Sequence, residues 1–137
     1  MAINIIALEK DLFFAVKIRD TLRYHDMVVT TVRTLTALEQ AISSNETNKP
    51  ALAIINISAQ GVDWETAIRT ASAEGIPVLA FGSHIDLDAQ ARARQAGARR
   101  VVANSKFARD MPGLIQRTLQ MPTGAASVIE EGDDDDA

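Results

Sequence analysis

Several short apolar runs of this sequence end in residues whose side chains could carry out chemistry. These are Glu9, Lys10 and Asp11 after the first run, Asn56 and Ser58 after the third, Gly82, Ser83 and His84 after the fourth, and Asn104, Ser105 and Lys106 after the fifth. Carboxylates of such a set can act as nucleophiles or hold a hard cation. Asn56 offers only a neutral amide, so it is either a working group or the mark of a site without chemistry.

Alternating patterns predict the elements that position these residues. Apolar, β-rich runs predict strands at 3–8, 27–32, 51–57, 76–81 and 99–103, and amphipathic stretches predict helices at 11–24, 36–43, 63–74, 86–96 and 110–120. We expect Thr36 and Glu39 to form a capping box, Asp63 and Asp86 to be N-caps, and Gly97 to end a helix.

Five βα units predict an α/β fold with a doubly wound, five-stranded parallel sheet of the flavodoxin-like kind. The third and fourth runs are almost entirely apolar, as in strands buried on both faces, whereas the second alternates and is expected at an edge. Ligands of such sheets bind beyond the carboxyl ends of the strands, where the residues of the opening paragraph lie.

Composition limits the function classes. The chain has no cysteine, which excludes disulfides and thiolate chemistry, and no apolar run approaches the roughly 20 residues of a membrane span. Six of its 18 acidic residues lie at 130–136, which leaves 14 basic against 12 acidic residues in the rest. We expect a cytoplasmic protein with one domain at 1–120 and a disordered acidic tail at 121–137.

The order of these segments resembles the receiver domain of bacterial response regulators over about residues 3–120. The resemblance is carried by "IIALEKD", "KPALAIINI", "GIPVLAFGS" and "QAGARRVVANSKF". It implies the strand order 2-1-3-4-5 and a site in which an aspartate ending the third strand is phosphorylated. It also implies an acidic pair that holds Mg²⁺, a hydroxyl ending the fourth strand and a lysine ending the fifth.

Transferred position by position, this set is almost empty. The phosphoacceptor falls on Asn56, and the acidic pair falls on Glu9 and Lys10. The remaining positions fall on Gly82 (with Ser83 next to it), on Asn104 (with Lys106 two residues on) and, for the aromatic residue of the fifth strand, on Val101. The resemblance therefore implies a degenerate pseudo-receiver that is not an enzyme, binds no cofactor, and has lost or weakened Mg²⁺ binding.

Lys10 and Asn56 each leave two interpretations open. Lys10 could be a fixed cation that pairs with Glu9 or Asp11 and bonds the Asn56 carbonyl, or it could be a surface lysine. Asn56 could instead cap the loop that follows it. His25 and His84 have no accompanying ligand cluster, so we expect no metal site.

Basic residues gather in the last third of the domain. The candidate partner-binding face consists of Arg92, Arg94, Arg99, Arg100, Val101, Lys106 and Arg109. In receivers this surface serves dimerisation and effector docking, so the resemblance implies a protein partner of a signalling pathway or a homodimer. The acidic tail could mask this face, and the near absence of stacking aromatics argues against nucleic acid as a ligand.

The sequence thus predicts a phosphorylation-independent interaction module of bacterial signalling. The alternative is a flavodoxin-like domain that binds a small ligand or cofactor. That alternative is disfavoured because "EKDLFF" is acidic and lacks the glycines with which a loop cradles phosphate.

Overall fold

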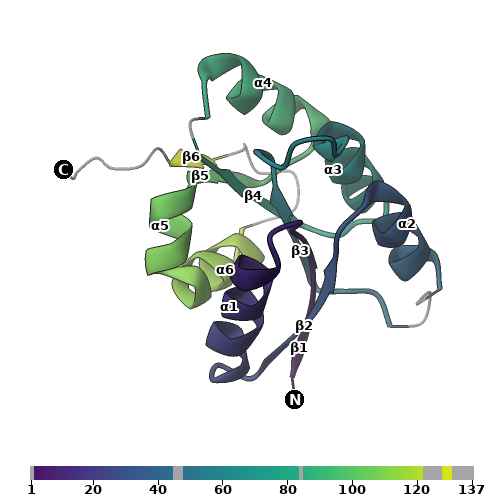
Figure 1. Ribbon diagram of the computed structural model, residues 1–137, viewed down its shortest axis with the longest axis vertical. Coiled ribbons are helices and arrows are strands. Elements are labelled where there is room, and N and C mark those ends of the chain that lie inside the picture. Colours follow the sequence, from purple (N-terminus) through teal and green to yellow (C-terminus); the bar gives the residue numbers. More distant parts are fainter. Residues whose placement is uncertain (1, 45–47, 84, 122–127, 131–137) are drawn as a thin grey trace.

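The fold is an α/β sandwich built on one parallel sheet (Figure 1). A computed structural model describes residues 2–44, 48–83, 85–121 and the backbone of 128–130. The strands are β1 (Ile3–Leu8), β2 (Met27–Val32), β3 (Leu52–Asn56), β4 (Val78–Gly82), β5 (Arg100–Ala103) and β6 (Val128–Glu130). Their order in the sheet is β2-β1-β3-β4-β5-β6, and every neighbouring pair is parallel. The predicted order 2-1-3-4-5 and the edge position of the second strand are confirmed.

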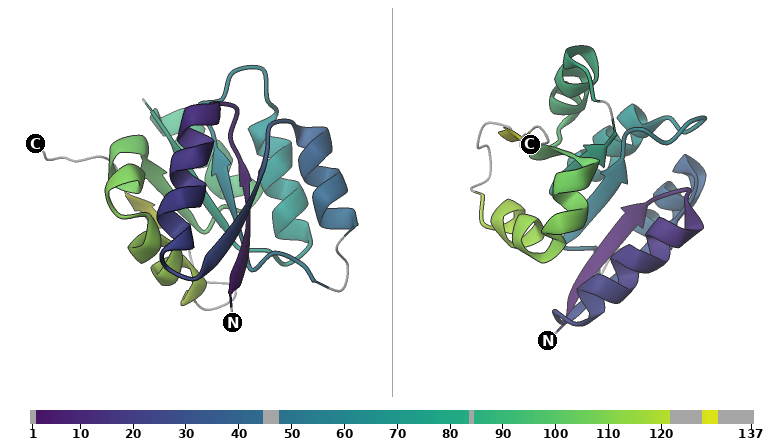
Figure 2. Two further views of the ribbon diagram at one scale, coloured as in Figure 1. Left: turned by 60° about the horizontal axis from the view of Figure 1, so that its bottom comes forward. Right: turned by 60° about the vertical axis from the view of Figure 1, so that its left-hand side comes forward.

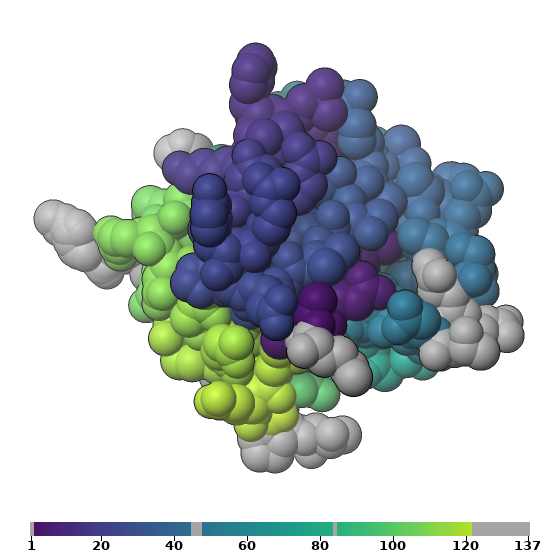
Figure 3. All heavy atoms as spheres, turned by 90° about the horizontal axis from the view of Figure 1, so that it is seen from below, coloured from purple at the N-terminus to yellow at the C-terminus, as the bar shows by residue number. Residues whose placement is uncertain are grey.

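Helices cover both faces of the sheet (Figure 2). They are α1 (Leu12–Arg23), α2 (Leu35–Ser43), α3 (Trp64–Ala73), α4 (Leu87–Ala96), α5 (Asn104–Arg109) and α6 (Met111–Leu119). On one face α1 lies beside α6, and Figure 3 shows the two in contact at the surface. The other face carries α2, α3 and α4, of which α3 contacts both neighbours.

Two apolar clusters result, one on each side of the sheet. Ile5, Ile54 and Phe81 face α1 and α6, whereas Ile55 and Ala80 face α2, α3 and α4. These side chains come from neighbouring positions of the same strands, since successive side chains of a strand point to opposite faces. Because both faces of β3 and β4 are buried, the residues along these strands have to be compatible with an apolar surrounding, which explains their continuous apolar runs.

Most helix boundaries follow local capping. Asp63 and Asp86 accept hydrogen bonds from Thr66 N and Ala89 N, as expected, and Gly97 ends α4 at a φ of 121°. The prediction for the second helix was wrong, because Thr34 and not Thr36 is its N-cap, with Oγ1 accepting from Ala37 N.

Two further differences lie at the carboxyl end. Residues 104–109, for which no helix was predicted, form α5, and residues 128–130, which were predicted to belong to the tail, form β6 beside β5. The expectation that residues 121–137 are disordered is therefore wrong for 128–130. The expected behaviour of residues 122–127 and 131–137 lies outside the described residues, as does the predicted strand-end residue His84.

Candidate functional site

A small pocket opens where β1, β3 and β4 end and α5 begins, at the edge of the sheet where the sequence placed it. Its volume is about 160 Å³, and it is lined by Glu9, Asp11, Phe14, Asn56, Ser58, Ser83 and Asn104. Four of the six predicted pocket residues are thus brought together. The other two, Lys10 and Gly82, do not line it.

Glu9 and Asn56 form the floor of the pocket and are bound to each other. Glu9 is only 2% exposed, and Asn56 Nδ2 donates to both of its carboxylate oxygens at 2.9 and 3.1 Å. Asp11 N donates to Glu9 Oε2 at 3.0 Å, and Ser58 N donates to Asn56 Oδ1 at 2.8 Å. The last bond spans two residues, so Asn56 caps the loop that follows it, as one of the two interpretations predicted.

This arrangement removes the chemistry that a carboxylate would provide at position 56. A neutral amide cannot form an acyl phosphate, and the amide nitrogen and oxygen are both engaged in the bonds above. The Asn56 side chain instead supplies the hydrogen-bond donors that a buried carboxylate needs to remain in the interior. Asn56 therefore has a structural role at this site.

Lys10 lies on the surface, next to the pocket residue Glu9 in sequence but outside the pocket. Its Nζ donates to the carbonyl oxygen of Gln60 at 2.9 Å, in the loop between β3 and α3. A Cβ built on Gly61, the next residue of that loop, lies 3.8 Å from the same nitrogen. The fixed-cation interpretation of Lys10 is wrong, because the ammonium group is bound to a loop carbonyl and not to the carboxylates.

Ser58 fills the space that a hydroxyl-bearing side chain at position 82 would need. A Cβ built on Gly82 would lie 2.5 Å from Ser58 Oγ and 3.2 Å from Ser58 N, closer than ordinary van der Waals contact. Ser58 Oγ donates to the carbonyl oxygen of Ser83 at 2.8 Å. The pocket thus keeps a hydroxyl, but it comes from β3's loop and is held by a backbone carbonyl. The sequence showed Ser58 only as a turn serine, and nothing in its pattern predicted this contact.

Three aromatic rings support the pocket from below. Phe81 of β4 stacks on Phe107 of α5, with ring centroids 4.3 Å apart. Phe14 of α1, which lines the pocket, lies 5.6 Å from the Phe81 ring. Asn104 is the first residue of α5 and reaches the pocket from an exposed position, whereas Lys106 follows within α5 and does not line the pocket.

The pocket does not fit Mg²⁺ or a phosphoryl group. Both carboxylate oxygens of Glu9 already accept from N–H donors of Asn56 and Asp11, and Asp11 Oδ1 accepts from Phe13 N and Phe14 N as the N-cap of α1. Within the described ranges, no group of three or more acidic, histidine or cysteine side chains is arranged to hold a metal ion. The residues that line the pocket carry carboxylates and no basic side chain, so an anion would meet negative charge.

A small-ligand site of the flavodoxin kind finds no support in this pocket. Ligand sites usually enclose about 300–1,000 Å³ and are mostly apolar, whereas this pocket encloses about 160 Å³ and is lined largely by polar side chains.

The candidate partner-binding face is divided by the fold. Arg94 and Arg109 are exposed, and Arg99 and Lys106 are half-buried. Arg100 and Val101 are buried, with 6% and 1% of their surface exposed, so their assignment to a contact surface was wrong.

The two corrections have a common physical cause. Arg100 Nε donates to Thr118 Oγ1 at 3.2 Å, which ties β5 to α6 on one side of the sheet. Val101, the next residue, points to the other side and packs with Ala93 and Ala98. Because β5 is covered on both faces, a charged residue in its first position is also enclosed.

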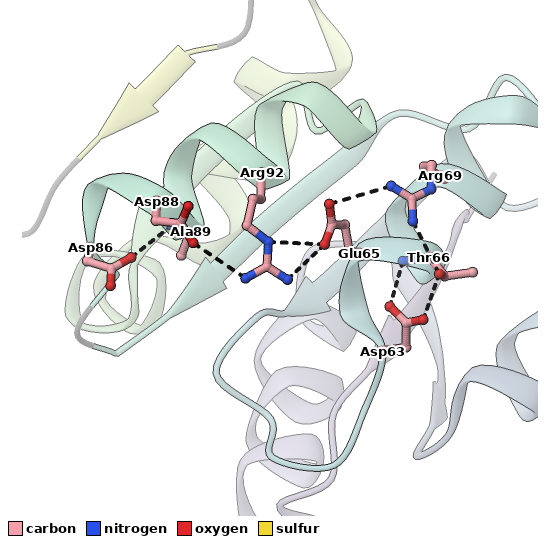
Figure 4. Close-up of polar contacts among 8 residues, drawn as sticks. All are labelled: Asp63, Glu65, Thr66, Arg69, Asp86, Asp88, Ala89 and Arg92. Carbon is pink, nitrogen blue, oxygen red and sulfur yellow. Dashed lines mark hydrogen bonds and ion pairs between the residues drawn. The ribbon is translucent and has the colours of Figure 1, made fainter.

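Arg92 belongs to a polar network that joins α3 and α4 (Figure 4). Its guanidinium donates to Glu65 Oε1 through Nε at 3.1 Å and Nη2 at 2.8 Å, and it lies 5.0 Å from the Trp64 ring centroid. The hydrogen bond from Arg92 lowers the pKa of Glu65, and the partner carboxylate raises the pKa of Arg92. Arg92 therefore holds α4 against α3 and is not a free contact residue.

The same network extends along both helices. Arg69 lies 3.5 Å from Glu65 Oε2, and Asp88 lies 3.6 Å from Arg92 Nη1. At the start of α3, a side-chain hydrogen bond from Thr66 lowers the pKa of Asp63. The network consists of exposed groups, and two nitrogens of Arg92 share Glu65 Oε1, which links α4 to α3 at the surface.

Several solved structures with this arrangement are described as receiver domains. A response regulator receiver protein from Burkholderia phymatum matches with a TM-score of 0.75 at 17% identity, over 90% of this chain and 99% of that one. The beryllofluoride-activated receiver domain of Klebsiella pneumoniae RstA matches with a TM-score of 0.74 at 19% identity, over 86% and 99%. The response regulator domain of Thermotoga maritima CheB matches with a TM-score of 0.73 at 12% identity, over 89% and 99%.

The chain has the receiver fold. No family model and no curated protein matches the sequence. At identities below 20%, the likeness to these structures establishes the fold alone. Function has to be inferred from the residues of the site. Within the described part of the chain, none of the helices has the length and apolar character that a bilayer span requires.

Proposed function

We propose that the chain is a pseudo-receiver, an interaction module of bacterial signal transduction that works without phosphorylation and is not an enzyme. The observation that carries the proposal is the pair of Glu9 and Asn56, which bond to each other where a phosphoacceptor and its metal ligand would stand. The filled space over Gly82 supports it, since a hydroxyl-bearing residue there would collide with Ser58.

The partner is a protein that docks on the outer face of α4. Leu87 is 78% exposed, and Ala91 and Arg94 follow it at intervals of four and three residues, so that the three share one face of the helix. An exposed apolar side chain beside an arginine is a composition that protein interfaces favour, and the link from Arg92 to Glu65 ties this helix to α3. This face replaces the broader arginine-rich surface expected from the sequence.

The test is a titration with Mg²⁺ and beryllofluoride, a mimic of the phosphoryl group, followed by amide NMR. We expect the signals of Glu9, Asn56 and Ser83 to stay in place up to millimolar ligand, as the signal of the remote Leu22 does. Saturable shifts confined to the pocket would overturn the proposal. Incubation with acetyl phosphate followed by intact-mass measurement gives a second, covalent readout, and a phosphorylated chain would equally contradict it.

The docking surface has its own test once a binding protein is in hand. Leu87→Asp and Arg94→Glu should each weaken binding at least about tenfold without changing thermal stability. Arg19→Glu on α1, at a comparably exposed position away from α4, is the matched charge control and should bind normally. Equal binding by the α4 variants and the control would contradict docking on α4.

A further inference from the structure

We propose that the open edge of β5 is an acceptor site for an extended acidic segment, and that the chain's own C-terminal strand β6 occupies this site as an internal competitor. A partner protein that presents such a segment would displace β6. This inference deepens the proposed function, on which it rests for the existence of a partner, because it assigns a regulated contact next to the α4 face.

The register of β6 shows how the site is filled. Arg100, Val101 and Val102 of β5 lie opposite Val128, Ile129 and Glu130 of β6 in a parallel arrangement. Without β6, β5 would be the end of the sheet, because the strand order runs from β2 at one edge to β4 and β5 at the other. Figure 1 shows β6 as a short strand at the side of β5 that faces away from β4. Addition of a strand to a free edge is a general mode of peptide recognition.

The pairing of β6 with β5 is short enough for a competing strand to displace β6. β6 consists of three residues, whereas β1 and β2 pair over six. Residues 120–127 connect it to α6, so it competes as a tethered segment at an effective concentration on the order of millimolar. To displace β6, a free segment must be present above that concentration or must make more contacts with β5. A partner strand longer than three residues meets the second condition.

Charge specifies the kind of segment that fits. The strand sequence "VIE" is followed directly by "EGDDDD", so the occupant is a β-branched apolar pair with an acidic continuation. Because β6 runs parallel to β5, its last residue, Glu130, is paired at the carboxyl edge of the sheet, the edge at which α5 begins. The last turn of α5 carries Lys106 and Arg109, and an acidic continuation of the paired strand is complementary to them in charge.

The experiment uses the full chain with the substitution Ile129→Pro and a synthetic peptide of residues 121–137 added in trans. Ile129 is the central residue of the three-residue pairing, and proline has no N–H to offer to the ladder. We expect the variant to bind the peptide with amide shifts at Arg100–Ala103, and the unsubstituted chain to bind at least about tenfold more weakly, because its own β6 competes.

Two control peptides separate backbone pairing from charge. A peptide with Ile129→Pro should fail to bind, and a peptide with its six acidic residues amidated should bind more weakly at low salt and lose its salt dependence. Binding of the proline peptide with unchanged affinity would contradict strand addition. Equal affinity of the amidated peptide would contradict the acidic specificity.

Several outcomes would overturn the inference. A folded Ile129→Pro chain, as judged by its thermal transition, that does not bind the peptide refutes the acceptor site, and equal binding by both chains refutes internal competition. Concentration-dependent dimerisation of the unsubstituted chain in sedimentation, with β5 shifts, would mean that β6 exchanges between copies. These results are independent of the beryllofluoride titration, so failure of either proposal can be told from failure of the other.

Discussion

Exchanging Asn56 for aspartate tests whether the site is built around an amide–carboxylate pair. In Asn56→Asp, the nitrogen that donates to Glu9 at 2.9 and 3.1 Å becomes a second carboxylate oxygen. Two carboxylates then lie side by side at a buried position, since Glu9 is only 2% exposed to water. The variant places an aspartate where the receiver resemblance puts the phosphoacceptor, yet we expect it to be markedly less stable than the parent.

The size of the effect follows from two limits. Two unit charges about 3 Å apart repel by about 5 kcal/mol at an effective dielectric constant of about 20. The pair can avoid this by retaining one proton, which at pH 7.5 costs about 1.4 kcal/mol for each pH unit above the usual aspartate pKa of about 3.9. Both limits place the loss at no more than about 5 kcal/mol at pH 7.5. That is within the stability of a typical domain, so the variant should still fold.

The sign of the pH dependence is fixed by the same pair. Repulsion and burial raise the pKa of the introduced carboxyl in the folded state above its unfolded value. The destabilisation is therefore small below about pH 4, where the introduced carboxyl is protonated in both states, and it grows as pH rises through the folded pKa. Urea denaturation of parent and variant between pH 4 and pH 8 measures the difference, provided that both unfold in two states.

Glu9→Gln in combination with Asn56→Asp is the matched control. The double variant exchanges amide and carboxylate, so Asp11 N and Ser58 N, which now bond to Glu9 and Asn56, still find acceptors. We expect it to recover at least about 2 kcal/mol of the loss at pH 7.5. A single variant as stable as the parent, a penalty independent of pH, or a double variant without recovery would each refute the account of this pair.

Three further predictions concern other parts of the molecule. Gly82→Ala should lower the free energy of unfolding by about 1–3 kcal/mol through its collision with Ser58, and by at least about 1 kcal/mol less in a Ser58→Ala background. Urea denaturation of the four chains measures this coupling, and strictly additive effects would contradict it. Arg100→Ala should cost about 1–3 kcal/mol because it removes a buried hydrogen-bonding group, whereas the exposed control Arg94→Ala should change thermal stability by less than about 0.5 kcal/mol. Arg92 of α4 lowers the pKa of Glu65 in the folded state. The pair therefore stabilises the fold above about pH 4.3, the usual glutamate pKa, and this contribution is lost as the pH falls through the lowered pKa. Glu65→Gln should therefore differ from the parent in urea denaturation at pH 6, and the difference should shrink as the pH is lowered below about 4, whereas a difference that does not change with pH would be inconsistent with the ion pair.

The sequence predicted the scaffold because the scaffold depends on local patterns. The apolar run ending at Asn56 is long enough only for a buried strand, and the aspartates at 63 and 86 begin helices wherever the chain goes next. Position 34 was missed in favour of position 36 because both are threonines near the start of the same helix. Capping depends on which of them has extended backbone, and the sequence does not contain that information.

The sequence also predicted which residues would gather at the pocket. Parallel strands end at one edge of the sheet, so Glu9, Asn56, Ser83 and Asn104 meet there whatever their side chains do. The same reasoning could not orient Lys10, because a long flexible side chain at a strand end can reach the pocket or the neighbouring loop. In the structure, Lys10 Nζ donates to the carbonyl oxygen of Gln60, so the side chain lies against the loop.

By itself, then, the sequence determined the order of the elements, the two faces of each strand and the absence of a carboxylate at position 56. Tertiary structure decided which partners Asn56 and Ser58 have, because these contacts join residues far apart in the chain. Asn56 completes the hydrogen bonding of Glu9 across 47 residues, and Ser58 occupies the space beside Gly82. Tertiary structure also decided that Arg100 is enclosed and that β6 lies on the edge of β5, since burial and strand pairing depend on the whole fold and not on local pattern.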